Sequence, residues 1–201
     1  MAKVVVIGVG GYAGSHIAEA AVQRDFDVVG FSRSEVAMQL AGVHYKQGSI
    51  LSAEDRTRML DGCDVVVVSV SARGNMLGNV RPAISDLAHE ASERGVRLGV
   101  IGGAGSLHVS PGGPLVVESG FPEEFKPEAL EMRSVLEDLR SSSPDLDWFY
   151  VSPAGGFGPE NRGEYRGEYR VGGDVLLTDD EGVSNISGAD FGVAIADELE
   201  E

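Results

Sequence analysis

Val4-Val5-Val6-Ile7-Gly8-Val9-Gly10-Gly11-Tyr12-Ala13-Gly14 is the stretch that decides the fold of this 201-residue chain. Its first four residues are apolar and β-branched, as in a buried strand of a parallel sheet. Residues 8–13 then fit the pattern G-x-G-x-x-A, and residues 8–14 fit G-x-x-G-x-x-G. The pattern from Ser15 onward is helical. A strand, a glycine turn and a helix in this order predict a site where free N–H groups at a helix N-terminus approach a pyrophosphate.

Short apolar runs alternate with helical patterns along most of the chain. The runs do not alternate in polarity, which is typical of parallel strands covered on both faces. The expected strands are Val4–Ile7, Val28–Phe31, His44–Lys46, Val65–Val70, Val96–Ile101 and Trp148–Val151. The expected helices between them are Tyr12–Arg24, Ser52–Leu60, Met76–Arg94 and Pro127–Arg140. We therefore predict an α/β fold with a doubly wound parallel sheet, a Rossmann fold, in a single domain over residues 1–201.

The pattern changes after Val151. Residues 153–163 are rich in glycine and proline and are expected to form a long loop. Gly163-Glu164-Tyr165-Arg166 is then repeated directly as Gly167-Glu168-Tyr169-Arg170. A repeat of four residues is too short for a structural array, so it is interpreted as a local duplication.

The last part of the chain is expected to form a small C-terminal extension. Val171 and Val175–Leu177 predict a short hairpin, and a capping pattern at Ser187 predicts a last helix through Glu198. This part, about residues 152–201, is expected to cover the carboxyl edge of the sheet on the acceptor side. Ligands of open α/β sheets bind at that edge.

Charge excludes several classes of function. The formal net charge is −16 at pH 7, so a nucleic-acid partner and docking on anionic membranes are not expected. The charge is uneven, because residues 1–120 hold 12 acidic and 10 basic residues and residues 121–201 hold 20 and 6. An anionic cofactor therefore meets little repulsion in the first part, whereas the second part is expected to disfavour strongly anionic acceptors.

Composition also indicates where the protein works. Only three of the 16 basic residues are lysines, as in acidic proteins of salt-loving microbes; an ordinary acidic cytosolic protein is the alternative. No targeting segment and no apolar run long enough for a bilayer are visible, so we expect a cytoplasmic protein. The single cysteine, Cys63, excludes a disulfide framework, and the four histidines show no metal-binding spacing, so no metal is predicted.

The end of the second expected strand selects the nucleotide. Enzymes that use NAD place an acidic residue there, which holds the ribose hydroxyls. This chain has Ser32-Arg33-Ser34 instead. Arg33 and the two hydroxyls could receive a 2′-phosphate through charge-assisted hydrogen bonds, so NADP is favoured over NAD. The alternatives are that Arg33 is only a solvated loop residue, or that it stacks on adenine without selecting between NADP and NAD.

Several segments beyond the glycine turn carry a family resemblance. The most specific are Gly102-Gly103-Ala104-Gly105-Ser106-Leu107 and Phe121-Pro122-Glu123-Glu124, with Gly48-Ser49-Ile50 and Ser152-Pro153-Ala154 in support. Over nearly its whole length the chain resembles the atypical short-chain dehydrogenase/reductases. The nearest group contains NADH-flavin reductases and NAD-dependent epimerase/dehydratase-like proteins, with NmrA-like proteins as relatives. The resemblance implies NAD(P) binding and oxidoreductase activity.

The chain departs from the family pattern in three places. Ser49 stands where the family often has Asp near the adenine, and Gly10 stands where Thr is common. Catalytic members of the wider superfamily carry Tyr-x-x-x-Lys on the helix after the fifth strand. The corresponding positions here are Ala129 and Arg133, and no Tyr-x-x-x-Lys occurs in the chain. Proton transfer to a sugar or steroid alcohol by that pair is therefore not expected.

Hydride transfer to a flavin or quinone does not need that pair, because the cofactor carries the chemistry and water or a weak acid can supply the proton. Ser106 is predicted to orient the acceptor, and His108 is a weaker candidate for lending a proton. Phe121 and Phe125 are expected around the acceptor. The predicted cofactor-binding residues are Gly8, Gly10, Gly11, Tyr12, Ala13, Gly14, Ser32, Arg33, Ser34, Ser49, Ser71, Ala72 and Pro153.

These observations predict an NAD(P)H-dependent oxidoreductase that passes hydride from NADPH to a small planar acceptor such as a flavin or quinone. One alternative is a non-catalytic NAD(P)-sensing regulator of the NmrA-like type. A nucleotide-sugar epimerase or dehydratase is a third, weakened by the missing Tyr-x-x-x-Lys. The expected partner is the small-molecule acceptor, and a homodimer is allowed.

Overall fold

The structure, a computed structural model, describes residues 1–201 and contains one sheet of six parallel strands. Valine side chains of β1 lie opposite those of both neighbouring strands, so that Val5 pairs with Val29 on one side and with Val66 on the other. The strand order is β3-β2-β1-β4-β5-β6, which reverses at β1 and opens a crevice at the carboxyl edge there. The strands are β1 Lys3–Ile7, β2 Asp27–Ser32, β3 Val43–Gln47, β4 Val65–Val68, β5 Arg97–Ile101 and β6 Trp148–Val151.

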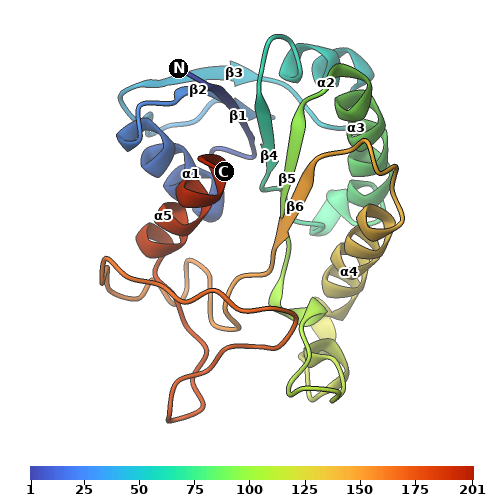
Figure 1. Ribbon diagram of the computed structural model, residues 1–201, viewed down its shortest axis with the longest axis vertical. Coiled ribbons are helices and arrows are strands. Elements are labelled where there is room, and N and C mark those ends of the chain that lie inside the picture. The colour runs from blue at the N-terminus through green and yellow to red at the C-terminus, as the bar shows by residue number, and fades with distance from the viewer.

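Helices cover both faces of the sheet (Figure 1). Val4 and Val6 of β1 pack in a cluster with α1 and α5, whereas Val5 and Ile7 pack in a second cluster with α2, α3 and α4. The alternation follows from the two-residue period of a strand. The predicted doubly wound parallel sheet is confirmed. None of the helices is long and apolar enough to cross a membrane. The helices are α1 Tyr12–Gln23, α2 Ala53–Met59, α3 Val80–Arg94, α4 Lys126–Arg140 and α5 Gly188–Leu199.

Local capping signals set where two helices begin. The Ser52 hydroxyl accepts a hydrogen bond from the N–H of Asp55 at 3.2 Å, at the start of α2. The Ser187 hydroxyl accepts one from the N–H of Asp190 at 3.0 Å, at the start of α5. Each bond satisfies an N–H group that has no partner within its helix. The capping pattern predicted at Ser187 is confirmed, and Ser52 caps the helix that was expected to begin at that residue.

Two predicted boundaries are wrong. The helix expected from Met76 begins at Val80, because Gly78 has a φ of +78° and a right-handed helix cannot pass through that conformation. The strand expected to reach Val70 ends at Val68. In both places the apolar residues extend beyond the regular element, so the apolar pattern overestimates its length.

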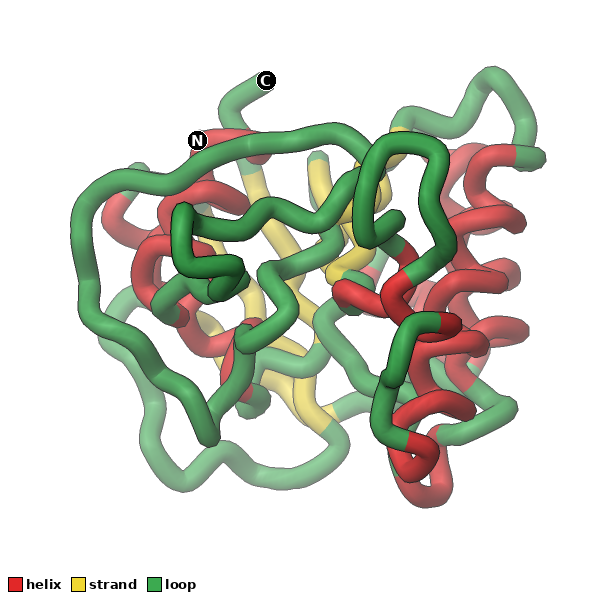
Figure 2. Tube along the Cα trace, turned by 90° about the horizontal axis from the view of Figure 1, so that it is seen from below, coloured by secondary structure: helices red, strands yellow, loops and turns green.

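Residues 152–187 contain no helix and no regular strand, so the hairpin predicted around Gly172-Gly173 is also wrong. The segment instead pairs with the loop after β5. The N–H of His108 donates to the carbonyl of Asp174 at 2.7 Å, and the N–H of Leu176 donates to the carbonyl of His108 at 2.9 Å. This segment and the other loops lie across the carboxyl edge of the sheet (Figure 2).

The C-terminal segment ends in α5, which packs closely on α1. A Cβ atom on Gly192 would lie 2.4 Å from the carbonyl oxygen of His16, and one on Gly188 would lie 2.2 Å from the His16 ring. Glycine at both positions allows the two helices to approach, since any side chain would hold them apart. This contact holds the C-terminal segment over the same edge of the sheet as the glycine turn.

Candidate functional site

The glycine turn lies between β1 and α1 at the carboxyl edge. Gly8 has a φ of +89°, and a Cβ atom there would lie 2.7 Å from the carbonyl oxygen of Ser69. A Cβ atom on Gly14 would lie 2.3 Å from the carbonyl oxygen of Gly8. The helix therefore packs directly on the turn, and both positions require glycine.

The first N–H groups of α1 are free. Gly11 is the N-cap and makes no side-chain capping bond, and the N–H groups of Tyr12, Ala13 and Gly14 donate to no protein atom. Gly10 and Gly11 are exposed and place no side chain over this helix end. Free N–H groups and the positive end of the helix dipole both attract an anion. The residues present therefore fit the pyrophosphate of a dinucleotide.

The side chain of Tyr12 turns away from this helix end. Its hydroxyl donates to the carbonyl of Arg162 at 3.3 Å and accepts from the N–H of Gly188 at 3.1 Å. Its ring centre lies 5.2 Å from that of Phe157. The sequence prediction for Tyr12 can thus apply only to its backbone N–H. The side chain ties α1 to the C-terminal segment.

The end of β2 lies beside the turn. The hydroxyl oxygen of Ser32 would be 3.6 Å from a Cβ atom on Gly10. Arg33 is exposed and makes no ion pair; its Nη1 donates to Oδ1 of Asn75 at 3.2 Å. Ser34 is exposed, and its hydroxyl makes no hydrogen bond within the protein. Sequence reasoning missed Asn75, which lies 42 residues from Arg33 in the loop after β4 and carries no motif of its own.

Three other predicted cofactor-binding residues differ in which of their groups a ligand could contact. Ser49 lies in the turn before α2, where its N–H donates to the Asp55 carboxylate at 2.8 Å and its hydroxyl accepts from Leu51 N–H at 3.3 Å. Ser71 is exposed in the loop after β4. Ala72 is 1% exposed and belongs to the hydrophobic core, so only its backbone is available to a ligand.

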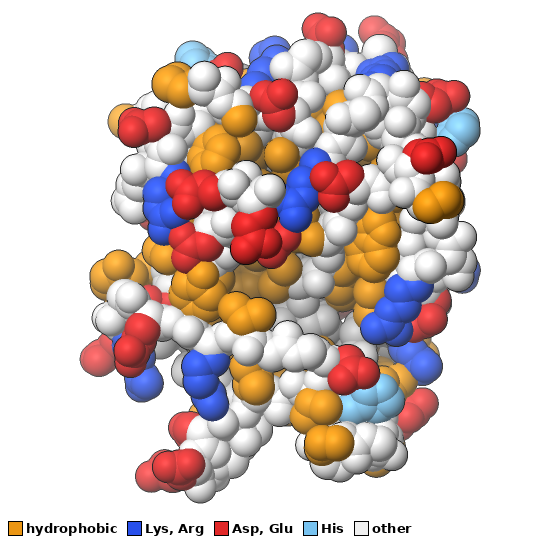
Figure 3. Space-filling model, in the orientation of Figure 1, with side chains coloured by type: hydrophobic (Ala, Val, Ile, Leu, Met, Phe, Trp, Pro, Cys, Tyr) orange, Lys and Arg blue, Asp and Glu red, His pale blue; other side chains and the backbone are white.

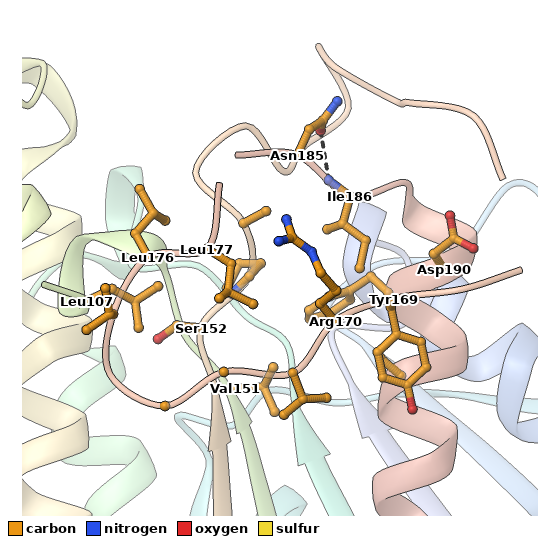
Figure 4. Close-up of a pocket in the computed structure, with 18 of the residues that line it drawn as sticks. Leu107, Val151, Ser152, Tyr169, Arg170, Leu176, Leu177, Asn185, Ile186 and Asp190 are labelled. Carbon is orange, nitrogen blue, oxygen red and sulfur yellow. Dashed lines mark hydrogen bonds between the residues drawn. The ribbon is translucent and has the colours of Figure 1, made fainter. Parts of the chain in front are cut away.

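A cavity of about 880 Å³ lies between β6, α5 and the C-terminal segment. Ser106 and Pro153 both line it, so the structure brings together the predicted orienting donor and one predicted cofactor residue. Hydrophobic side chains line the hollowed face between α5 and β6 (Figure 3), and Leu107, Val151 and Leu176 lie around the cavity (Figure 4). A mostly apolar cavity of this size suits a small organic molecule.

Ser106 is held by a residue that sequence reasoning assigned only to a strand. The Ser106 hydroxyl lies 3.4 Å from the hydroxyl of Tyr150, which donates to the carbonyl of Met132 at 3.0 Å. Burial raises the pKa of Tyr150, so its hydroxyl stays protonated. His108 does not line the cavity, because its Nδ1 hydrogen-bonds the carbonyl of Gly113 at 2.7 Å.

The two phenylalanines expected around the acceptor lie outside the cavity. Phe121 packs on a small cluster that contains Leu115 and Val117. Phe125 is 42% exposed, and the guanidinium of Arg73 lies 5.5 Å from its ring centre. Both rings thus pack near the N-terminus of α4, which corrects the expectation.

Ala129, Arg133 and Cys63 do not line the cavity. Ala129 is buried in α4, and Arg133 faces Glu118 with its Nη1 3.7 Å from a carboxylate oxygen. These are the positions of the family's Tyr and Lys, so no such pair forms.

Burial raises the pKa of Cys63 to about 11, which makes its thiol unreactive at neutral pH.

The C-terminal segment is fastened over the cavity by α5. The buried carboxylate of Asp190 accepts hydrogen bonds from the N–H groups of Arg166 at 3.1 Å and Gly167 at 2.9 Å. The hydroxyl of Tyr169 donates to the carboxylate of Asp197. That hydrogen bond raises the pKa of Tyr169 to about 12.

The tyrosine contact predicts a pH dependence. An unfolded tyrosine has a pKa of about 10, so between about pH 10 and 12 the unfolded chain loses the proton that folded Tyr169 keeps, and folding stability falls. We expect Tyr169→Phe to destabilise the protein at pH 8 and to cost much less at pH 11.5, measured by urea unfolding. Tyr165→Phe is the matched control, because Tyr165 is 66% exposed in the first copy of the repeat. An equal cost of Tyr169→Phe at both pH values would contradict the expectation.

Comparisons with known proteins agree with this geometry. A family model described as NAD(P)H-binding matches residues 8–199. The uncharacterized protein YwnB of Bacillus subtilis (strain 168) is 32% identical, and the match covers 98% of this chain and 92% of that protein.

Two solved structures show the same fold and near-complete coverage. One is a putative NADH-flavin reductase from Streptococcus pneumoniae TIGR4, 32% identical with a TM-score of 0.82, covering 100% of this chain and 93% of that one. The other is a putative epimerase from Bacteroides thetaiotaomicron, 29% identical with a TM-score of 0.86, covering 100% and 91%. The chain therefore belongs to the NAD(P)H-binding family and is a Rossmann-fold, oxidoreductase-like protein that resembles the atypical short-chain dehydrogenase/reductases.

Proposed function

We propose that the protein binds NADPH and reduces a small planar acceptor such as a flavin or quinone. The observation that carries this proposal is the arrangement at one edge of the sheet. The free helix end at Gly11–Gly14 and the unpaired Arg33 lie at the same edge as the apolar cavity that contains Ser106 and Pro153. A dinucleotide whose pyrophosphate binds at the helix end would reach toward the cavity.

Arg33 supports NADPH over NADH. It follows β2 directly, where an acidic residue would hold the ribose hydroxyls of NAD, and its guanidinium has only the neutral Asn75 as a partner. A 2′-phosphate could therefore receive charge-assisted hydrogen bonds from Arg33. Ser32 and Ser34 would add hydroxyl donors beside it.

The cavity residues would position the acceptor. Bound nicotinamide supplies the hydride. Ser106 would donate its hydroxyl hydrogen bond to the acceptor, held in place by Tyr150. Water would supply the proton that the acceptor takes up together with the hydride, because α4 carries no Tyr-x-x-x-Lys pair. This arrangement favours an acceptor that is reduced at a planar ring over an alcohol substrate.

The test is to mix the protein with NADPH and either riboflavin or menadione, both of which are uncharged, and to follow NADPH absorbance across a salt series. The salt series is needed because the net charge is −16, so the acidic side chains repel one another in dilute buffer. Protein-dependent oxidation with either acceptor supports the proposal. Tight NADPH binding with no oxidation of any acceptor would overturn it in favour of a non-catalytic NAD(P) sensor.

Arg33→Ala tests the choice of nucleotide. We expect it to weaken NADPH binding by about tenfold, since a charged hydrogen bond to the 2′-phosphate is lost, and to leave NADH binding nearly unchanged. Arg94→Ala is the matched control, because it removes the same charge from α3. The dissociation constants of NADPH and NADH are measured for both variants by fluorescence titration. Equal losses for both nucleotides in Arg33→Ala would contradict NADPH selection.

A further inference from the structure

Arg170 is an exposed residue that lines the cavity between apolar side chains. Residues 121–201 hold 20 acidic and only 6 basic residues, yet Arg170 is placed at the cavity rather than against one of the carboxylates. Its guanidinium lies between Leu177 and Ile186, both of which are apolar (Figure 4). Its one hydrogen bond within the protein runs from Nη2 to the carbonyl of Thr178 at 3.0 Å. The remaining N–H donors of the guanidinium are free.

The duplicated Gly-Glu-Tyr-Arg sequence explains how Arg170 reaches this place. Gly163 and Gly167 open the two copies with φ values of +63° and +72°, so each copy begins with a turn that favours glycine. Asp190 holds the junction of the copies through two backbone N–H groups. The hydroxyl of Tyr169 binds Asp197 on α5. The backbone on the N-terminal side of Arg170 is thereby fixed.

Two other charged groups of the cavity wall are already paired, whereas Arg166, like Arg170, lines the cavity without an ion pair. The carboxylate of Glu198 accepts from Arg97 Nη2 at 2.6 Å. Arg140 pairs with Glu137 at 2.8 Å. Arg170 makes no ion pair, although it lies in the most acidic part of the chain. A guanidinium without an ion pair beside apolar side chains can recognise one anionic group, because the two oxygens of a carboxylate can accept two of its N–H groups at once.

We propose that Arg170 binds the single anionic oxygen group of a small, largely apolar, planar ligand, such as an aromatic carboxylate. The apolar wall would take the ring, and the planar guanidinium can also stack on it. Glu164, Glu168 and Asp174 also line the cavity, so a ligand with several negative charges is disfavoured. The identification of this ligand as the hydride acceptor rests on the proposed function. The binding site at Arg170 is inferred independently of that function.

Two probes of nearly equal shape test the charge requirement. The full-length protein is titrated by calorimetry, at one fixed salt concentration and with NADP⁺ present, with 2-naphthoate or with the neutral 2-naphthamide. We expect 2-naphthoate to bind about tenfold more tightly, because only the anion makes charge-assisted hydrogen bonds. Equal affinities, tighter binding of the amide, or no binding of 2-naphthoate at millimolar concentration would each overturn the proposal.

Two variants locate the effect. Arg170→Met keeps an apolar stem of similar reach and should abolish the preference for naphthoate. Arg162→Met removes the same charge from the same segment but does not line the cavity, so the preference should persist. A preference that survives in Arg170→Met overturns the proposal. Binding needs no turnover, so an Arg170-dependent site in a protein that oxidises no NADPH would refute the proposed function alone.

Discussion

Replacing Gly14 by alanine is expected to lower the free energy of unfolding by about 3 kcal/mol, the upper part of the range for an overpacked site. The added Cβ would lie 2.3 Å from the carbonyl oxygen of Gly8 and 2.7 Å from the hydroxyl oxygen of Ser69. The carbonyl of Gly8 cannot yield easily because it is part of the backbone, although the Ser69 hydroxyl could rotate away. The start of α1 would have to move away from the turn.

The same movement should weaken NADPH binding, because the free N–H groups at the start of α1 would leave their place beside Gly10 and Gly11. The measurements are urea unfolding and an NADPH titration of the folded variant. Gly103→Ala is the matched control, since a Cβ there meets nothing within 4 Å, and it should unfold within about 1 kcal/mol of wild type. A Gly14→Ala protein as stable as this control would show that the helix does not pack on the turn as described.

Replacing Arg56 by alanine is expected to lower the free energy of unfolding by about 3 kcal/mol, because it leaves the Glu90 carboxylate, whose side chain is only 22% exposed, without its cation. The Arg56 side chain is only 7% exposed, although it is charged. Its guanidinium donates to Glu90 and Asp86 of α3 and to the carbonyl of Ile50, each at 3.0 Å. It therefore joins α2 to α3 and to the turn before α2.

Arg58→Ala is the control for Arg56, on the same helix. The Arg58 side chain is 48% exposed and pairs with Asp55 three residues earlier. An exposed pair of this kind contributes about 1 kcal/mol or less. Urea unfolding of both variants should separate them clearly. Similar losses for the two would mean that solvent reaches Arg56 as freely as Arg58.

Elements of the fold that depend on neighbouring residues could be predicted from the sequence. The β1–turn–α1 unit follows from apolar residues, glycine positions and a helical period that all lie within 23 residues of the N-terminus. Ser52 and Ser187 could be identified as caps because a cap bonds an N–H three residues further on. Prediction failed where a backbone partner was distant. The expected hairpin around Gly172-Gly173 is replaced by hydrogen bonds to His108, more than 60 residues earlier in the chain.

The site divides in the same way. The placement of the glycine turn and of Ser32-Arg33-Ser34 could be predicted, because each directly follows a recognisable strand. The lining of the cavity could not be predicted, because the direction of a side chain depends on contacts that no local pattern records. Phe121 and Phe125 have the right chemistry but pack near α4 instead of at the cavity. Arg170 carried no functional signal beyond its place in the repeat.

The amino-acid sequence alone determined the doubly wound parallel sheet, the turn at Gly8–Gly14 and the excess of acidic residues in the second part of the chain. Those properties arise from short-range sterics and from composition. Only the tertiary structure decided that Arg170 faces the cavity without a carboxylate partner. The physical reason is that Asp190 and Asp197 of α5 hold the segment before Arg170, while Gly188 and Gly192 let α5 approach α1. Those contacts join parts of the chain that are distant in sequence, and they exist only once the sheet has formed.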